Sequence, residues 1–153
     1  MYQLIMITAV LSTLHNSPIN RKDVNCLATA VYSEARGESL KDRYGIAHLV
    51  MNRVDSGRYP SQPCEVIYEQ RRNKYTNKLT DMFTGIHSIH PDRTSKAWKD
   101  SVITASLVLL GKSKDPTNGA TLVYAPLKCT PNWDFTKTTA TLETKTLKFL
   151  KEN

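Results

Sequence analysis

The sequence predicts an α+β domain that is mainly helical and has a small antiparallel β-sheet near the C-terminus. Apolar residues recur in residues 23–36 and 94–110 at the three- and four-residue spacing of an amphipathic helix. The segment 121–125 is β-prone, and the segment 144–150 alternates loosely between apolar and polar residues. We therefore expect two late strands, with a helix as the alternative for the second.

The first expected helix spans residues 23–36. The carboxylate of Asp23 can accept the free amide hydrogens of the first turn, and Gly37 follows where a helix tends to stop. A second helix is expected over residues 42–54, ended by Ser56 and Gly57. The apolar stripe of the first helix consists of Val24, Leu27, Ala28, Val31 and Ala35.

The middle of the chain combines turns with a long polar stretch. Residues 58–63 contain two prolines and are expected to form a turn, followed by a short helix over residues 65–70. Residues 71–93 are predicted to be irregular and to form one wall of a cleft, because so long a loop within a domain is usually functional. Thr94 or Ser95 then caps the long helix over residues 94–110.

Residues 112–119 and 126–139 are expected to be loops, the second of which carries Trp133. The sequence contains no repeat, low-complexity tract or interdomain linker. Residues 23–153 are therefore predicted to form a single domain, for which 153 residues in total are sufficient.

Residues 1–22 are expected to be a separate N-terminal apolar segment that docks as a helix on the domain. Residues 1–20 carry no charged side chain, so a weak signal or a signal-anchor is the alternative. The apolar stretch is about half the length that spans a bilayer, and Arg21 and Lys22 follow it. Stable membrane insertion is therefore not expected.

The formal net charge of +7 favours polyanionic partners. The basic residues are spread out without a dense arginine cluster, so nucleic acid is not the expected partner, and the bacterial envelope is an alternative. The three cysteines leave at least one thiol unpaired, and Cys26 and Cys64 are interpreted as small core residues of a protein made in a reducing cytosol.

Glu34 is the strongest candidate for a reactive residue. It lies seven residues beyond Leu27, on the edge of the apolar stripe of the first helix and near its end. Desolvation raises the pKa of such a carboxyl group, which suits a general acid. A half-exposed helix glutamate, or one paired with an arginine, is the alternative interpretation.

The segment from Leu27 to Glu38, which contains Glu34-Ala35-Arg36-Gly37-Glu38, resembles the opening of the SleB-type (spore-cortex-lytic) cell-wall hydrolase family. The resemblance continues through the segments 45–54, 59–68, 119–124 and 131–133, and covers roughly residues 24–151. It implies a lysozyme-like fold, similar to goose-type lysozymes and lytic transglycosylases, and it implies that Glu34 is the catalytic acid.

The resemblance further implies a lytic transglycosylase that cleaves the β-1,4 bond between N-acetylmuramic acid and N-acetylglucosamine in peptidoglycan glycan strands. In that route one carboxyl group acts as acid and then as base, while the substrate's acetamido group and C6 hydroxyl complete the reaction. Glu38, one turn beyond Glu34, would lie beside it on the helix, so it is interpreted as a structural or substrate-ordering group.

Sugar rings bind to proteins by hydrogen bonds and by stacking on aromatic faces. The expected substrate-binding residues are Tyr75 and Thr76 in the long loop, together with Tyr124 and Trp133 in the late segment that relatives place near the cleft. Core packing is the alternative role for each aromatic residue.

Three other functions remain as alternatives. They are a hydrolytic muramidase, a zinc-dependent amidase that would use His87 and His90, and a non-catalytic glycan-binding module. The spacing of the two histidines is not that of a strong zinc site, so no metal or other cofactor is expected.

Size and resemblance together suggest a bacteriophage lysin for host cell lysis. Such an enzyme would be a monomer made in the host cytoplasm that acts on the wall or in the periplasm, delivered by a holin or within a virion.

Overall fold

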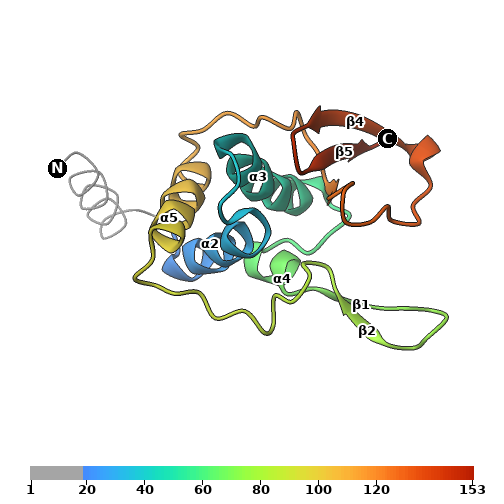
Figure 1. Ribbon diagram of the computed structural model, residues 1–153, viewed down its shortest axis with the longest axis horizontal. Helices are drawn as coiled ribbons and strands as arrows, with labels where there is room; N and C mark the ends of the chain where they lie inside the picture. Colours follow the sequence, from blue (N-terminus) through green and yellow to red (C-terminus); the bar gives the residue numbers. More distant parts are fainter. Residues whose placement is uncertain (1–18) are drawn as a thin grey trace.

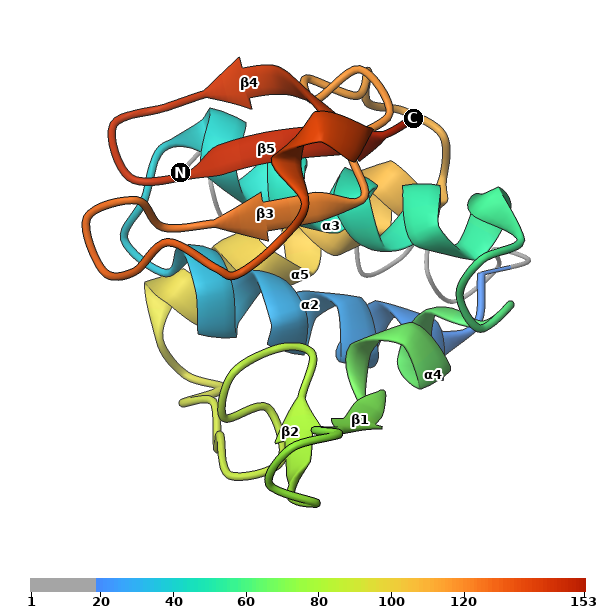
Figure 2. The same ribbon diagram turned by 90° about the vertical axis from the view of Figure 1, so that its right-hand side faces the viewer.

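The computed structural model describes residues 19–153, in which three main helices pack beside two small antiparallel sheets. Figure 2 shows the helix α2 between a three-stranded sheet on one side and a two-stranded hairpin on the other. The predicted N-terminal docked helix lies outside the described residues, except for residues 19–22. In the part of the chain from residue 19 onward, no helix is long and apolar enough to cross a membrane.

Helix α2 (Arg21–Ala35) is the central helix, and most of its residues are buried. It begins two residues before the predicted start because the side chain of Asn20 accepts the amide hydrogen of Lys22. The prediction of Asp23 as the capping residue is therefore wrong, and Asp23 lies in the first turn. The predicted apolar stripe is confirmed, since all five of its members are buried.

Helix α3 (Leu40–Ser56) is longer than predicted at both ends. Ser39 caps its N-terminus through the amide of Asp42, and Gly57 ends it in the left-handed conformation, with φ of 72°. Gly45 packs against the buried ring of Phe149, where an added Cβ would lie 2.6 Å from Cζ. The absence of a side chain at Gly45 thus lets the late strand approach the helix.

The short helix α4 (Pro63–Ile67) is linked to α2 by a disulfide between Cys26 and Cys64, whose Cα atoms lie 5.3 Å apart. The interpretation of these two cysteines as separate, unpaired residues is therefore wrong, whereas the core position of Cys26 is confirmed, since it is 6% exposed. They are 38 residues apart in the sequence, and only the packing of α4 against α2 brings them together. Cys129 is free and exposed.

The polar stretch after α4 contains a β-hairpin of β1 (Gln70–Arg72) and β2 (Leu79–Asp81). The prediction that residues 71–93 are irregular is wrong for five of these six residues, and Gln70, predicted as the end of the short helix over residues 65–70, is also in a strand. Their strand character escaped the sequence because five of the six are exposed and none packs into the core, so no alternating apolar pattern marks them. Figure 1 shows the hairpin projecting away from the helices.

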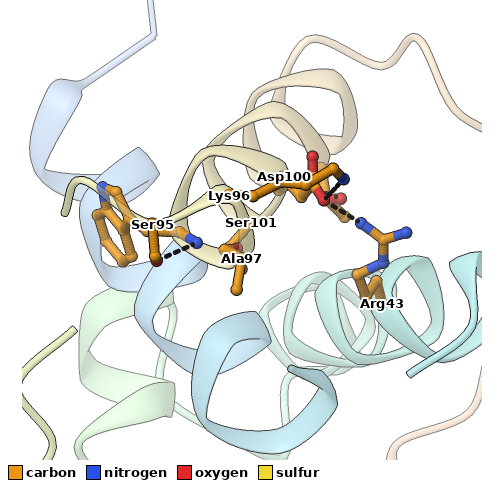
Figure 3. A network of polar contacts seen from close by, with 8 residues as sticks. Arg43, Ser95, Lys96, Ala97, Asp100 and Ser101 are labelled. Atoms are coloured by element: carbon orange, nitrogen blue, oxygen red, sulfur yellow. Dashed lines mark hydrogen bonds and ion pairs between the residues drawn. The ribbon is translucent and has the colours of Figure 1, made fainter. Parts of the chain in front are cut away.

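Helix α5 (Lys96–Leu109) confirms the predicted long helix, and Ser95 caps it by accepting the amide hydrogen of Trp98. Asp100 in this helix pairs with Arg43 of α3 at 3.3 Å and with Lys96 at 2.6 Å (Figure 3). The first of these ion pairs ties α5 to α3.

The late sheet has the strand order β3–β5–β4 and is antiparallel throughout. Strands β3 (Leu122–Tyr124) and β5 (Lys148–Glu152) confirm the two expected strands, and the helical alternative for the second is wrong. The 3₁₀ turn η1 (Phe135–Lys137) and strand β4 (Thr138–Glu143) were not predicted. Strand β4 is a half-exposed edge strand in which three of six residues are threonine, so it lacks an apolar stripe.

Candidate active site

A cavity of about 1080 Å³ lies beside the C-terminal end of α2. Residues 80–84, at and after the end of the hairpin, line one side, and residues 122–125, 128–129, 131–134 and 137–138 of the sheet and its loops contribute to the other. Ser33, Glu34 and Arg53 also line it. The prediction that the long polar stretch forms a cleft wall agrees with this arrangement.

Glu34 is half-buried at this cavity. Burial raises the pKa of its carboxyl group above the ordinary value of 4.5, and the positive charges of Lys128 and Arg53 oppose part of that rise. Within residues 19–153 its carboxyl group has no ion pair or hydrogen bond. The arginine pair is thus not what the structure contains, whereas the half-exposed position agrees with the intermediate burial of Glu34. The carboxyl group is free to give a proton to a ligand.

Arg53 contributes a fixed positive charge to the same cavity. Its side chain is 4% exposed, and its Nε donates a hydrogen bond to the carbonyl of Thr121 at 2.7 Å. The guanidinium also lies over the rings of Tyr59 and Phe83, at 4.9 and 5.3 Å from their centroids. These contacts hold the guanidinium in place, so the opposing charge near Glu34 does not depend on a mobile side chain.

Lys128 is a different kind of cation. It is exposed in the turn after Ala125, and within the described chain its ammonium group has no acidic partner. Sequence patterns did not single out either cation, because each belongs to the site only through the folding of segments far from Glu34.

Tyr124 and Trp133, two of the predicted sugar-binding residues, line the cavity together with Glu34. Their rings meet edge to face at 5.8 Å, and Phe135 packs against both at 5.9 and 6.2 Å. Phe135 was not predicted, since a single aromatic residue in a polar loop gives no periodic signal. The cluster provides aromatic faces of the kind on which sugars stack.

Tyr75 and Thr76, the other two predicted sugar-binding residues, lie in the turn of the hairpin and do not line this cavity. Tyr75 is 85% exposed. The structure therefore does not bring this pair together with Tyr124 and Trp133, and their contact with substrate stays a prediction.

Glu38 does not lie beside Glu34, and that expectation is wrong. Helix α2 ends at Ala35 and the chain turns at Gly37, with φ of 77°, so the helical spacing no longer applies. Glu38 instead accepts a hydrogen bond from Thr146 Oγ1 at 3.1 Å and lines a second cavity with Arg43 and Asp100. This contact fits the structural part of the interpretation, and its substrate-ordering part stays a prediction.

Three other carboxylates line the cavity, and sequence reasoning did not select them. Asp81 accepts hydrogen bonds from Gln70 and interacts with His87, and Asp134 accepts from Thr136. Glu152 accepts hydrogen bonds from Tyr59 at 3.0 Å and from Thr121 at 2.6 Å. Each is engaged by neighbouring side chains, in contrast to Glu34.

A zinc centre would need three ligands close together. Among residues 19–153, no group of three or more histidine, cysteine, aspartate or glutamate side chains has a metal-binding arrangement. His87, one of the two histidines considered for zinc, pairs with Asp81 at 2.9 Å.

The chain is similar in sequence to spore cortex-lytic enzymes. Over 118 residues the chain is 29% identical to a spore cortex-lytic enzyme of Bacillus cereus, and over 111 residues it is 30% identical to that of Halalkalibacterium halodurans. These alignments cover 77% and 72% of this chain but 40% and 29% of the relatives. The chain thus spans less than half the length of these curated relatives.

Two solved structures are similar in fold. The catalytic domain of the germination-specific lytic transglycosylase SleB from Bacillus anthracis matches with a TM-score of 0.65 and 25% identity, covering 88% of this chain and 98% of that one. The catalytic domain of the Bacillus cereus SleB protein matches with a TM-score of 0.64, 25% identity and coverage of 88% and 94%. These matches confirm the predicted lysozyme-like, mainly helical fold class.

The family model described as Cell Wall Hydrolase matches residues 37–150, which is most of the chain. Its matched range begins three residues after Glu34. The interpretation of Glu34 as a reactive residue therefore depends on the geometry of the cavity and on the resemblance of the segment around it. With the relatives and the solved structures in agreement, the chain belongs to the cell wall hydrolase family.

Proposed function

We propose that this protein degrades peptidoglycan by cleaving the β-1,4 bond between N-acetylmuramic acid and N-acetylglucosamine, as a lytic transglycosylase with Glu34 as general acid and base. The observation that carries the proposal is the state of Glu34. It is half-buried at a cavity, its pKa is raised by that burial, and its carboxyl group is unpaired within the described chain. A protonated, unengaged carboxyl group is what the glycosidic oxygen requires.

In the first step Glu34 gives its proton to the oxygen of the glycosidic bond. The bond between that oxygen and the anomeric carbon of the muramic acid breaks, and its electron pair stays on the leaving sugar. The positive charge that develops on the muramyl ring is stabilised by the substrate's own acetamido group. Glu34 is now a carboxylate, which the nearby charges of Lys128 and Arg53 stabilise.

In the second step the ionised Glu34 takes the proton of the C6 hydroxyl of the same muramyl ring. The C6 oxygen bonds to the anomeric carbon, which closes an anhydro ring and restores the protonated Glu34 for the next cycle. The route needs no second enzymic carboxylate. This is consistent with the hydrogen bonds that engage Asp81, Asp134 and Glu152.

Product analysis on purified peptidoglycan tests the proposal. We expect the wild-type protein to release muropeptides with anhydro ends and the Glu34→Gln variant to lose roughly two to four orders of magnitude in rate, because an amide cannot donate this proton. Glu65→Gln is the matched control, since Glu65 is exposed on α4 and does not line the cavity.

The alternatives predict different products. Products with reducing muramic acid ends would show that the activity is that of a hydrolytic muramidase and not of a transglycosylase. Freed stem peptides would indicate an amidase. Unchanged turnover by Glu34→Gln would refute the assigned role of this residue.

We further propose that the protein acts outside the cytosol, in bacterial lysis or wall remodelling. The Cys26–Cys64 disulfide supports this, because such bonds persist in oxidising compartments such as the periplasm. Bacteriophage origin, and delivery by a holin or within a virion, stay predictions from size and resemblance. A bacterial culture that makes the protein would then lyse only when a holin is also produced. This result would support delivery through the membrane.

A further inference from the structure

The turn of the β1–β2 hairpin carries three exposed cations without acidic partners, namely Arg72, Lys74 and Lys78, which we call the basic tip. Arg72 donates hydrogen bonds to Asn77, and Lys74 lies over the ring of Tyr75 at 5.1 Å. In residues 19–153 none of the three forms an ion pair. The basic tip is therefore a local excess of positive charge.

The acidic residues of the hairpin lie at its base and are already engaged. Glu69 pairs with Arg71 at 3.2 Å, and Asp81 interacts with His87 at 2.9 Å. They leave the charge of the basic tip uncompensated.

The turn that carries the basic tip has a defined conformation. The side chain of Asn73 accepts the amide hydrogens of Tyr75 and Thr76, at 2.8 and 3.0 Å. Backbone bonds from Asn73 to Lys78 and from Asn77 to Asn73, both 2.8 Å, close the turn. The cations are thus presented together, so a partner that binds them does not have to order the loop first.

The position of the basic tip relative to the cavity limits what it can contact. Arg71 and Thr80 line the cavity, and Lys74 and Lys78 lie two or three residues further out on the hairpin, about 7–10 Å along the strands. Figure 1 shows the hairpin projecting in that direction, away from the helices. An extended side chain of a glycan strand bound in the cavity can span this distance to the basic tip.

Peptidoglycan strands carry such side chains. Each stem peptide branches from a muramic acid and bears free carboxylates, and a peptide of about four residues spans up to about 13 Å when extended. An extended stem peptide is long enough to reach from the cavity to the basic tip. Its negative charge is opposite to the positive charge of the basic tip. Lipid headgroups share the charge but are not attached to a strand held in the cavity, and phosphate polymers are set aside experimentally by the use of sacculi that lack them.

We propose that the basic tip binds the carboxylates of the stem peptides on the substrate strand, so that this protein prefers strands that still carry peptides. The proposal rests on the proposed function, because it assumes a glycan strand in the cavity. It assigns the hairpin a role in substrate recognition beyond the sugars at the cleavage site.

Binding to insoluble sacculi that lack phosphate polymers tests this proposal. The full chain with Glu34→Gln is used so that the sacculi stay intact, and it is compared with the same chain carrying Lys74→Glu and Lys78→Glu. Arg72 is retained because it bonds Asn77 in the turn. We expect the two charge reversals to weaken binding by roughly tenfold at low salt and the difference to shrink at high salt.

The matched control carries Lys112→Glu and Lys114→Glu in the loop after α5, away from the cavity and the hairpin. The Glu34→Gln parent has a charge of +8, one more than the +7 of the wild type, and each reversal lowers the charge by two, so both double variants have a charge of +4. The control is expected to bind intact sacculi within about twofold of the parent. Circular dichroism and the melting temperature establish that both variants fold.

Three results would overturn the proposal. Equal binding of the hairpin variant and the control to intact sacculi would show that the position of the charges is immaterial. An undiminished defect on strands stripped of their peptides by an amidase would assign the contact to the sugars. A defect confined to vesicles of anionic phospholipid would make a membrane the partner.

Failure of the proposed function and failure of the basic tip proposal are detected by different experiments. The binding measurement needs no turnover, whereas the role of Glu34 is judged from the products released by the protein without the Glu34→Gln change.

Discussion

Glu34 combines a buried position with access to a cavity, and these two properties depend on different features of the chain. Its place at the edge of the apolar stripe of α2 follows from helical spacing. Its raised pKa needs the walls that other segments build around it, and Lys128 and Arg53, which oppose the rise, come from those segments. The position of Glu34 on the helix thus follows from the local sequence pattern, whereas its raised pKa depends on tertiary packing.

The pH dependence of stability provides a prediction for this residue. Since burial raises the pKa of Glu34 in the folded protein, its stabilising contribution is complete below the pKa of the unfolded chain. That contribution is lost as the pH rises through the higher pKa of the folded state. Glutamine does not titrate, so we expect the melting temperature of Glu34→Gln to gain on that of the wild type as the pH rises from the pKa of the unfolded chain through the raised pKa of the folded state.

Thermal unfolding of both proteins across this pH range measures the effect, with Glu65→Gln as the control. The same ionisation should lower the cleavage rate on the alkaline side, because the deprotonated carboxyl group cannot act as the acid. A constant difference in melting temperature at every pH would contradict the raised pKa.

At the scale of the elements, the three long helices and the strands β3 and β5 were predictable, whereas β1, β2 and β4 were not. Helices α2, α3 and α5 have buried stripes that can be read from the sequence, and Ser95 of α5 was among the predicted caps. The caps of the other two helices, Asn20 and Ser39, were not predicted. Strands β1, β2 and β4 are exposed or lie at an edge, so their pairing depends on partners that the sequence does not point to.

The disulfide between α2 and α4 yields a prediction at this scale. Cross-links of this kind typically stabilise a protein by about 2–4 kcal/mol, because they restrict the unfolded chain. We expect Cys26→Ser with Cys64→Ser to lower the free energy of unfolding by that amount in urea titrations. Cys129→Ser is the control, since this cysteine is free and exposed.

Thiol labelling provides an independent check on the disulfide. The native wild-type protein should react at Cys129 alone, and the denatured and reduced protein should react at all three cysteines. Labelling of three thiols in the unreduced, denatured protein would contradict the disulfide.

At the scale of the whole molecule, the candidate site is a meeting of distant segments. The end of α2, the region after the hairpin and the late sheet all contribute to one cavity, although they span residues 33–153. Tyr124 and Trp133 were expected there and lie there, whereas Tyr75 and Thr76 lie on the hairpin turn. Resemblance to relatives identified these residues, but it did not determine which of them share the cavity.

Metal removal distinguishes the glycosidase from the amidase alternative at this scale. The proposed reaction uses only Glu34 and groups of the substrate, so we expect EDTA to leave the rate of anhydro product formation unchanged. Release of stem peptides that a chelator abolishes and zinc restores would favour the amidase. The control is the same assay after removal of the chelator by dialysis.

The sequence by itself determined the long helices, the place of Glu34 at the end of α2, and the late strands that complete the mixed fold. Only the tertiary structure decided that Cys26 meets Cys64, that Glu38 faces a different cavity from Glu34, and that Arg53 and Lys128 act on the same carboxyl group. The reason is physical. Helical periodicity depends on neighbours three or four residues away, whereas a cavity and its charges depend on how segments far apart in the chain pack against one another.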